Sequence, residues 1–324
     1  EMCIRDSCKH FGECGGCTYL DKPYGDQLAE KVSRAEKVLE AKAEEVYPSP
    51  KQYYYRSRVD YPVAEGPLIG FNKRGSWSEI INLEECFLQS SESNIIRNLF
   101  RKYLAERGIQ GWNRISRQGD VRFLTIIEGK FTGERMIFVT AYREFPLLNF
   151  LAKLKNERVR VDSLVLGINK GVRDDARAEE LKVLHGSETI SERVSNFAYL
   201  LHPNVFFQPN PYVLERMIRI ILDFLDPREG ERILELFAGS GTFTIPLAVL
   251  GHARITAVEA DSNAARIAEM NLKINRVKSV EVINERAERV SLKCDKTVVN
   301  PPSSGLSYKL VKRLKSDTED SSLY

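Results

Sequence analysis

The chain has 324 residues, of which 43% are hydrophobic and 29% are charged. This apolar content is sufficient for a packed core, and the length suggests about two domains. With 48 Lys and Arg against 45 Asp and Glu, the net charge is +3, and the charges are evenly spread along the chain. A polybasic tail is therefore excluded, but a basic stripe that binds nucleic acid is not. No apolar run could span a membrane and no signal peptide is visible, so we expect a cytoplasmic location.

Six cysteines are too few for a disulfide scaffold, yet Cys3, Cys8, Cys14 and Cys17 all lie within the first 17 positions. Clustered thiols in a chain without a secretion signal indicate a metal site. The chain begins with Glu1 instead of Met, and residues 1–7 look like translated sequencing adaptor. We therefore expect a fragment whose first seven residues are not native, and we set Cys3 aside.

The first part of the chain is predicted to form an α+β domain. A helix is predicted over Tyr24–Lys42, where apolar residues repeat at helical spacing. Strands are expected where β-branched and aromatic residues are bounded by Gly, Asn or Pro. These strands are Tyr53–Tyr61, Pro67–Phe71, Val121–Glu128, Met136–Ala141, Val161–Asn169 and Phe197–Leu201. Two further helices are predicted over Ser93–Arg107 and Pro146–Asn156.

Beyond Pro203, strands and helices alternate. The predicted strands are Ile233–Phe237, Ile255–Val258, Val280–Ile283 and Thr297–Val299. The predicted helices are Pro211–Phe224, Thr242–Leu250, Ser262–Asn275 and Leu306–Leu314. This short alternation implies a parallel, doubly wound sheet. We therefore predict an α/β protein, with a Rossmann-like domain over residues 203–324 that follows an α+β domain over residues 1–202.

A ligand pocket is predicted where the strand Ile233–Phe237 runs into Ala-Gly-Ser-Gly-Thr at residues 238–242. Glycines at such a turn let the backbone approach a ligand and open the helix N-terminus towards it. Glu259 ends the next strand, 20 residues after Gly239, and a carboxylate there can bind ribose hydroxyls. The third glycine of the dinucleotide fingerprint would fall at Thr244, so a ligand without phosphates is favoured. The spacing is similar to the S-adenosylmethionine site of methyltransferases, and a plain tight turn is the alternative.

The strand Thr297–Val299 ends in Asn300-Pro-Pro, which would also line this pocket. Methyltransferases of exocyclic amino groups have Asn-Pro-Pro as well, followed by an aromatic residue that stacks on the flipped base. Ser303 cannot stack in that way. The sequence therefore disfavours an amino-methyltransferase.

Cys8, Cys14 and Cys17, together with the isolated Cys86, can supply four thiolates. Iron–sulfur clusters take four Cys ligands, often three local and one remote, whereas structural zinc usually takes two paired ligand sets. The spacing favours a cluster and leaves zinc or no metal as alternatives.

These features together resemble the iron–sulfur-containing RNA (uracil-5-)-methyltransferases, which make 5-methyluridine in ribosomal RNA. The resemblance runs from Cys8 to Tyr324 and rests on the order and spacing of several short motifs. They are Cys8–Cys17, Tyr55–Arg58, the Cys86 segment, Val121–Arg122, Phe131–Glu134, Phe206–Asn210, Glu235–Phe243, Glu259 and Asn300–Pro302.

The resemblance implies that a 4Fe–4S cluster is held by Cys8, Cys14, Cys17 and Cys86. It also implies that S-adenosylmethionine contacts Gln208, Phe237, Thr242, Glu259 and Asn300, to which the turn adds Gly239 and Gly241. Gln208 offers an amide to the amino-acid end of the ligand, Phe237 an apolar wall, and Glu259 a ribose contact. Three residues depart from the family pattern: Thr242 where Asn is common, Asn300 in place of Asp, and Ser303 where Arg or Ala is commoner.

The resemblance implies a covalent mechanism in which a Cys thiolate adds to C6 of the uracil. C5 then attacks the methyl group, and a base removes the C5 proton after the uridine has flipped out of the RNA. The family's nucleophile lies in a Ser-Cys-Asn-Pro segment that would fall just beyond Tyr324. We therefore expect a C-terminally truncated methyltransferase domain without a catalytic residue, inactive as it stands, in which Cys294 is structural.

RNA is the expected partner of a monomeric protein, with large-subunit rRNA first and tRNA second. Basic residues that are interleaved with aromatic ones suit phosphate contact and base stacking, and scattered surface charge is the alternative. These basic residues are Arg56, Arg58, Lys73, Arg74, Arg114, Arg117 and Arg122. The alternatives for the whole protein are a tRNA uridine-54 C5 methyltransferase, a non-catalytic RNA-binding homologue, and a zinc module joined to an amino-methyltransferase.

Overall fold

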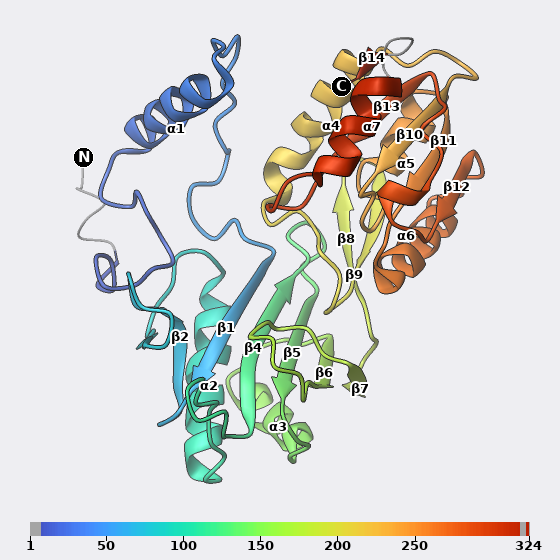
Figure 1. Ribbon diagram of the computed structural model, residues 1–324. Helices are drawn as coiled ribbons and strands as arrows, with labels where there is room; N and C mark the ends of the chain where they lie inside the picture. Colours follow the sequence, from blue (N-terminus) through green and yellow to red (C-terminus); the bar gives the residue numbers. More distant parts are fainter. Residues whose placement is uncertain (1–7, 318–321, 324) are drawn as a thin grey trace. The chain divides into compact units, whose positions relative to one another are not determined.

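The computed structural model of the protein describes residues 8–317 and 322–323 (Figure 1). The segment 1–7 with Cys3, predicted to be non-native, and Tyr324 lie outside the described residues. The chain forms two compact units, one of Glu1–Glu128 and Arg135–Glu188, the other of Gly129–Glu134 and Thr189–Tyr324. The division into residues 1–202 and 203–324 stays a prediction about domain organisation.

The first helix of the chain, α1, spans Tyr24–Leu39 and has no buried residue. It ends at Glu40, whose φ of 52° is left-handed. The sequence predicted an exposed amphipathic helix that begins at Tyr24, and this prediction is confirmed with an end three residues earlier than Lys42.

Among the described residues, the first unit contains a seven-stranded mixed sheet in the order β3-β2-β1-β4-β5-β6-β7. Its neighbouring strands are antiparallel except β5 and β6, which are parallel. The strands are β1 (Arg58–Ala64), β2 (Leu68–Asn72), β3 (Ile80–Asn82), β4 (Val121–Glu128), β5 (Arg135–Ala141), β6 (Ser163–Ile168) and β7 (Glu180–His185). The central strands β4 and β5 are buried along almost their whole length, which suits their β-branched and aromatic residues.

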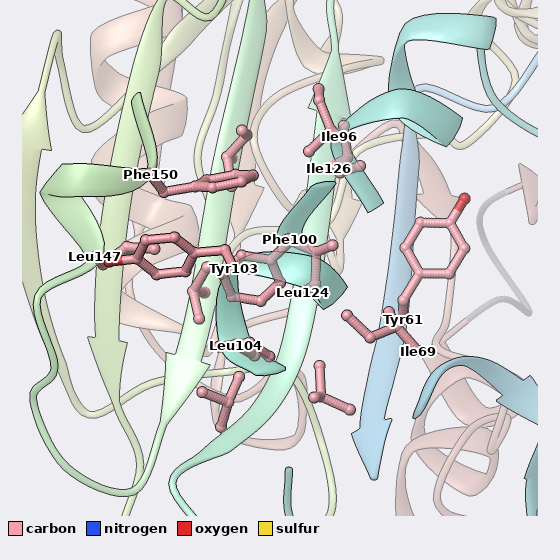
Figure 2. Close-up of a cluster of buried hydrophobic side chains, with 14 of the residues drawn as sticks. Tyr61, Ile69, Ile96, Phe100, Tyr103, Leu104, Leu124, Ile126, Leu147 and Phe150 are labelled. Carbon is pink, nitrogen blue, oxygen red and sulfur yellow. The ribbon is translucent and has the colours of Figure 1, made fainter. Parts of the chain in front are cut away.

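Two helices, α2 (Ser91–Glu106) and α3 (Phe150–Asn156), build the core of this unit with the central strands. The Ser90 hydroxyl caps α2 by accepting the Ser93 N–H at 3.2 Å. The ring centroids of Phe100 on α2 and Phe150 on α3 are 5.2 Å apart. Figure 2 shows these rings gathered beside Leu124 of β4. The packing fixes α2 on the sheet.

The strand predicted over Tyr53–Tyr61 begins later than expected, at Arg58. Tyr54 has a left-handed φ of 56°, and its N–H donates to the carbonyl of Phe87 at 2.7 Å. The rings of Tyr53 and Tyr54 each lie 5.9 Å from the Phe87 ring. A tertiary contact therefore overrides the local strand pattern.

Up to residue 317, three strands were missed from the sequence: β3, β7 and β8 (Ile190–Val194). β3 has only three residues, and β7 is a mostly exposed edge strand. Neither gives the alternating apolar pattern on which strand prediction depends.

The second unit is built on a parallel sheet with the order β12-β11-β10-β13-β14 within the described residues (Figure 1). Its strands are β10 (Arg232–Leu236), β11 (Arg254–Val258), β12 (Val280–Ile283), β13 (Lys296–Val299) and β14 (Ser322–Leu323). Its helices are α4 (Leu214–Leu225), α5 (Thr244–Leu250), α6 (Ser262–Ile274) and α7 (Tyr308–Asp317). β8 also pairs with β9 (Phe197–Leu201) in an antiparallel hairpin. Short 3₁₀ turns are η2 (Leu147–Asn149), η3 (Pro211–Val213) and η4 (Ala287–Arg289).

The strand order reverses at β10, with β11 and β12 on one side and β13 and β14 on the other. In doubly wound sheets, ligands bind outside the carboxyl ends of the strands at this reversal. The predicted doubly wound sheet is confirmed. The carboxyl end of β10 is consequently where a ligand is expected.

Candidate cofactor site and cysteine cluster

The loop after β10 makes the turn that the glycine motif predicts. Phe237, Gly239 and Gly241 have left-handed φ values of 62°, 59° and 80°, and the Gly241 N–H donates to the Ala238 carbonyl at 3.0 Å. This conformation costs a residue with a side chain about 1–2 kcal/mol, so glycine is favoured. A Cβ at Gly239 would meet no atom within 4 Å. The backbone there faces open space that a ligand can approach.

The Glu259 carboxylate ties this loop to the end of β11. Its Oε2 accepts the Gly239 N–H at 2.8 Å, and its Oε1 accepts the Asp261 N–H at 2.8 Å. The side chain is half-buried, and a carboxylate can accept about four hydrogen bonds. Glu259 can therefore hold the loop and bind ribose hydroxyls at the same time.

A second carboxyl group, that of Glu235 on β10, is fully buried below the loop. The Thr244 hydroxyl donates to its Oε2 at 2.6 Å. The pKa of Glu235 is raised to about 7, mainly by burial and slightly by the Glu259 charge, against the opposing effect of the Thr244 hydrogen bond. This bond joins the end of β10 to the first residue of α5 and fixes the turn between them.

Thr242 and Asn300 lie beside this loop. Thr242 is buried, with Oγ1 3.3 Å from the Ser240 Oγ, and its carbonyl accepts the Tyr199 hydroxyl at 3.1 Å. Asn300 is exposed at the carboxyl end of β13, and its N–H donates to the Leu236 carbonyl at 3.4 Å. Both residues are thus at the strand reversal.

Gln208 is half-buried in the segment between β9 and η3. The neighbouring Phe207 ring packs 5.6 Å from Tyr199, whose hydroxyl reaches the Thr242 carbonyl. This series of contacts connects the Gln208 segment to the glycine loop. Six of the seven predicted cofactor residues therefore lie directly at the strand ends, and Gln208 lies on an adjoining segment.

Asn271 on α6 is a supporting residue that the sequence reasoning missed. It is fully buried; its Nδ2 donates to the Ser240 carbonyl at 2.9 Å, and its Oδ1 accepts the Leu200 N–H at 2.8 Å. Buried amides require such partners. A polar residue on the apolar face of the predicted helix is the signal that would have identified it.

The four predicted metal ligands come together in the first unit. Cys14 and Cys86 are buried, Cys8 and Cys17 are half-buried, and all four are free thiols. The pKa of Cys17 is raised to about 11, mainly by burial and in smaller part by the charges of Cys86, Cys14 and Cys8. Cys17 therefore lies within electrostatic reach of the other three thiols. However, no three His, Cys, Asp or Glu side chains in the described part of the chain are placed to hold one metal ion.

The glycines between Cys14 and Cys17 let the cysteine loop approach β2. The Gly15 N–H donates to the Asn72 carbonyl at 2.8 Å, and a Cβ at Gly15 would lie only 2.9 Å from that oxygen. A Cβ at Gly16 would lie 2.8 Å from a ring carbon of Phe71. The Gly-Gly pair is thus required by close packing.

Asn94 and Arg74 hold the cysteine backbones. Asn94 Oδ1 accepts the Cys86 N–H at 2.8 Å, and its Nδ2 donates to the Cys86 carbonyl at 3.1 Å. Arg74 Nη2 donates to the Cys17 carbonyl at 2.8 Å. The local and the remote cysteine segments are both fixed by side chains.

Cys294 lies at the opposite end of the second sheet from Glu259, because it precedes β13. Its Sγ is 3.4 Å from the Leu292 carbonyl and 3.1 Å from the Thr297 Oγ1. β13 has four residues, so this thiol lies roughly 13 Å from the carboxyl end of the strand. Its position supports a structural role.

Among the predicted RNA-contacting arginines, Arg122 is 3% exposed. It donates to the Asn169 Oδ1 at 2.9 Å, and its guanidinium lies 5.0 Å from the Trp112 ring. Arg58 is paired with Asp60 at 2.9 Å. Arg122 therefore stabilises the fold and is too buried to contact an RNA phosphate.

The sequence pattern of the tRNA (uracil-5-)-methyltransferase family matches residues 23–299. The chain belongs to this family. A relative from Pyrococcus horikoshii, named tRNA (uracil(54)-C(5))-methyltransferase, is 33% identical over 98% of this chain and 75% of its own length. Another from the same organism, named 23S rRNA (uracil(747)-C(5))-methyltransferase, is 32% identical over 96% of this chain and 73% of its own.

A solved structure of this family supports the fold. The crystal structure of the Pyrococcus abyssi tRNA (uracil-54, C5)-methyltransferase in complex with S-adenosyl-L-homocysteine has a TM-score of 0.80 and 31% identity to this chain. The similarity covers 95% of this chain and 74% of that one. The predicted α/β methyltransferase fold is confirmed. Among the described helices, none has the length and apolarity that crossing a membrane requires.

Proposed function

We propose that this protein transfers the methyl group of S-adenosylmethionine to C5 of a uridine in RNA. The observation that carries the proposal is the open glycine loop held by Glu259 where the strand order of the sheet reverses. Membership of the tRNA (uracil-5-)-methyltransferase family and similarity to a relative crystallised with S-adenosyl-L-homocysteine support the same cofactor and reaction.

The residues at the strand ends fit this cofactor. Glu259 can accept ribose hydroxyls, Phe237 provides an apolar wall, and Gln208 offers an amide to the amino-acid end. The full set of proposed contacts is Gln208, Phe237, Gly239, Gly241, Thr242, Glu259 and Asn300. When bound, S-adenosylmethionine supplies an electrophilic methyl group. The chain's own residues orient the ligand against the backbone of the loop.

Two RNA substrates are candidates, large-subunit rRNA as our first proposal and tRNA as the second. Relatives named for the two activities are 32% and 33% identical to this chain, so similarity does not separate them. A monomer located in the cytoplasm remains our prediction for the state of the protein.

Tritium release tests the reaction at C5. The protein is incubated with S-adenosylmethionine and with rRNA or tRNA transcripts that contain 5-tritiated uridine. C5 methylation replaces that hydrogen, so we expect tritium release equal to methyl incorporation. Methyl incorporation without tritium release would indicate an amino-methyltransferase, and RNA binding with neither would indicate a non-catalytic homologue. Either result would contradict the proposal, and the transcript that releases tritium identifies the substrate.

We also propose that Cys8, Cys14, Cys17 and Cys86 hold a 4Fe–4S cluster. Four free thiols, three of which act electrostatically on Cys17, match the ligands of such a cluster in type and number. Thiolates on separate irons do not have to converge on one point. Arginine nitrogens that are buried without a partner in the same unit support a negative group there. We assign the cluster no step in methyl transfer.

Metal and sulfide analysis after anaerobic purification tests this second proposal. We expect iron and acid-labile sulfide in equal amounts in the natural protein. Stoichiometric zinc without iron or sulfide would contradict the cluster and support the zinc alternative. The absence of both metals would mean that the four cysteines are structural thiols.

A further inference from the structure

The guanidinium of Arg97, on α2, is the most unusual buried group outside the cofactor site. The side chain is 0% exposed, and its Nε donates to the Leu83 carbonyl at 3.2 Å. Its Nη1 and Nη2 are buried without a hydrogen-bond partner in the described part of the chain. Arginine is always charged, and leaving its buried donors unpaired is strongly unfavourable. The described residues alone do not compensate this charge.

Arg97 lies beside the cysteine cluster. Its guanidinium carbon is 5.1 Å from the centroid of the Tyr61 ring, which belongs to the same buried core as Cys86. One turn earlier on the same helix, Asn94 bonds both the N–H and the carbonyl of Cys86. Arg97 itself donates to the carbonyl of Leu83, three residues before Cys86, so it lies beside the segment that carries this cysteine.

Two other arginines lie against the cysteine segments. Arg74 Nη2 donates to the Cys17 carbonyl at 2.8 Å. The Arg56 N–H donates to the carbonyl of Leu88, two residues after Cys86, at 3.0 Å, and the Arg56 Nε is buried without a partner among the described residues. Three cations around neutral thiols would only repel one another. Around an anionic group they would be compensated.

We propose that Arg97 is the buried counter-charge of the 4Fe–4S cluster, with Arg56 and Arg74 as weaker contributors. This inference rests on the cluster proposed above. The thiolates and sulfides of such a cluster carry more negative charge than its irons neutralise, so the bound cluster is an anion. A buried cation stabilises that anion and favours the form with one more electron. Arg97 is thus a positioning residue that governs the retention and the reduction potential of the cluster.

The competing explanation is that Arg97 only packs against Tyr61 as a cation over a ring. In that case its removal would weaken the folded protein equally with and without the cluster. The reduction potential would not change. The two explanations therefore differ in measurable ways.

Replacing the charge tests the inference in the anaerobically purified full protein. Arg97→Met retains an apolar stem, and we expect iron release to a chelator to become about tenfold faster or more. We also expect the midpoint potential to shift to more negative values. Arg97→Lys keeps the charge and should remain close to the wild-type potential.

Arg101→Met is the matched control. Arg101 lies one helical turn further along α2, also donates to the Leu83 carbonyl, and also has a buried Nε without a partner among the described residues. Burial and the charge of Arg97 lower the pKa of Arg101, and the charge of Glu84 opposes them. We expect this variant to release iron at the wild-type rate and to keep the wild-type potential.

The effect of Arg97→Met on resistance to urea should differ in sign between the metal-free and the cluster-loaded protein. Without the cluster, Arg97 is an uncompensated buried charge, so Arg97→Met should be at least as resistant to urea as the wild type. With the cluster, the same variant should be less resistant, because the ligand stabilises the wild type more. Equal destabilisation in both states would establish the packing role and overturn the inference.

The outcomes separate this inference from the cluster proposal. Wild-type iron release and potential in Arg97→Met would overturn the inference and leave the cluster in place. Identical behaviour of Arg97→Lys and Arg97→Met would overturn the role of the charge. Wild-type protein without iron and sulfide would overturn the cluster proposal, and the inference with it.

Discussion

The glycine loop after β10 and the cysteine loop Cys8–Cys17 both present a candidate ligand site, but different forces hold them. The glycine loop is fixed by its own partners, because the Gly239 N–H meets Glu259 and the Ser240 carbonyl meets Asn271. The cysteine site combines thiols whose neutral form is favoured by burial, which raises their pKa, with arginine nitrogens that lack partners among the described residues.

This difference indicates which site is formed before its ligand arrives. A loop with satisfied hydrogen bonds is already organised for binding, and binding then needs little reordering. A group of thiols beside uncompensated cations gains stability from the ligand itself. We therefore expect the cofactor site to survive loss of the cysteine site.

The largest expected effect is the loss of the cluster on Cys86→Ser. The remote ligand is removed, so the variant should retain little iron, while its affinity for S-adenosylhomocysteine stays near that of the wild type. Cys294→Ser, which changes a half-buried thiol in the second unit, is the control and should keep its iron. Iron analysis and calorimetry measure both properties. A folded Cys86→Ser protein that no longer binds S-adenosylhomocysteine would contradict the expectation that the cofactor site survives loss of the cysteine site.

A smaller effect concerns the pH dependence of stability. Burial raises the pKa of Glu235 to about 7 from its ordinary 4.5, so the folded state holds this proton more tightly than the unfolded state. The resulting stabilisation is complete below pH 4.5 and is lost as the pH rises through about 7, by up to about 3 kcal/mol.

Glu235→Gln cannot titrate and should lack this loss. Urea unfolding of the two proteins at about pH 5 and about pH 8 measures the difference. If the wild type and Glu235→Gln lost the same unfolding free energy between these two pH values, Glu235 would be ionised in the folded protein at neutral pH and the prediction would be wrong.

The smallest expected effect comes from single methyl groups. A Cβ at Gly239 or at Gly230 would meet nothing within 4 Å, and both residues have positive φ, 59° and 83°. Alanine at either position should cost about 1 kcal/mol of unfolding free energy. Only Gly239→Ala should weaken S-adenosylhomocysteine binding, on the order of tenfold, because its methyl group would enter the cofactor space. Equal affinities of the two variants would place the ligand elsewhere.

The sequence predicted the parts of the molecule that depend on local pattern. The strand–glycine–helix turn and Glu259 at its spacing after Gly239 follow from the chain itself, and so does the alternation that gives the second sheet. The four cysteines were identified by composition and spacing. Their proximity required the fold, since Cys86 is far from the others along the chain.

The rest depends on tertiary contacts that no local pattern encodes. Tyr53 and Tyr54 have the composition of a strand but pack against Phe87. Arg122 resembled a surface cation but is buried against Trp112. Arg97 occupies an ordinary position in an amphipathic helix, and only its burial and its unpartnered nitrogens distinguish it.

Calorimetric titration with S-adenosylhomocysteine tests the cofactor site most directly. Glu259→Gln keeps the size of the side chain but removes the charge that holds the Gly239 N–H and would bind the ribose. Saturable binding to the wild-type protein, weakened about 10- to 100-fold in Glu259→Gln, is the result that we expect. No binding to the wild type, or unchanged affinity in the variant, would contradict the proposed cofactor site.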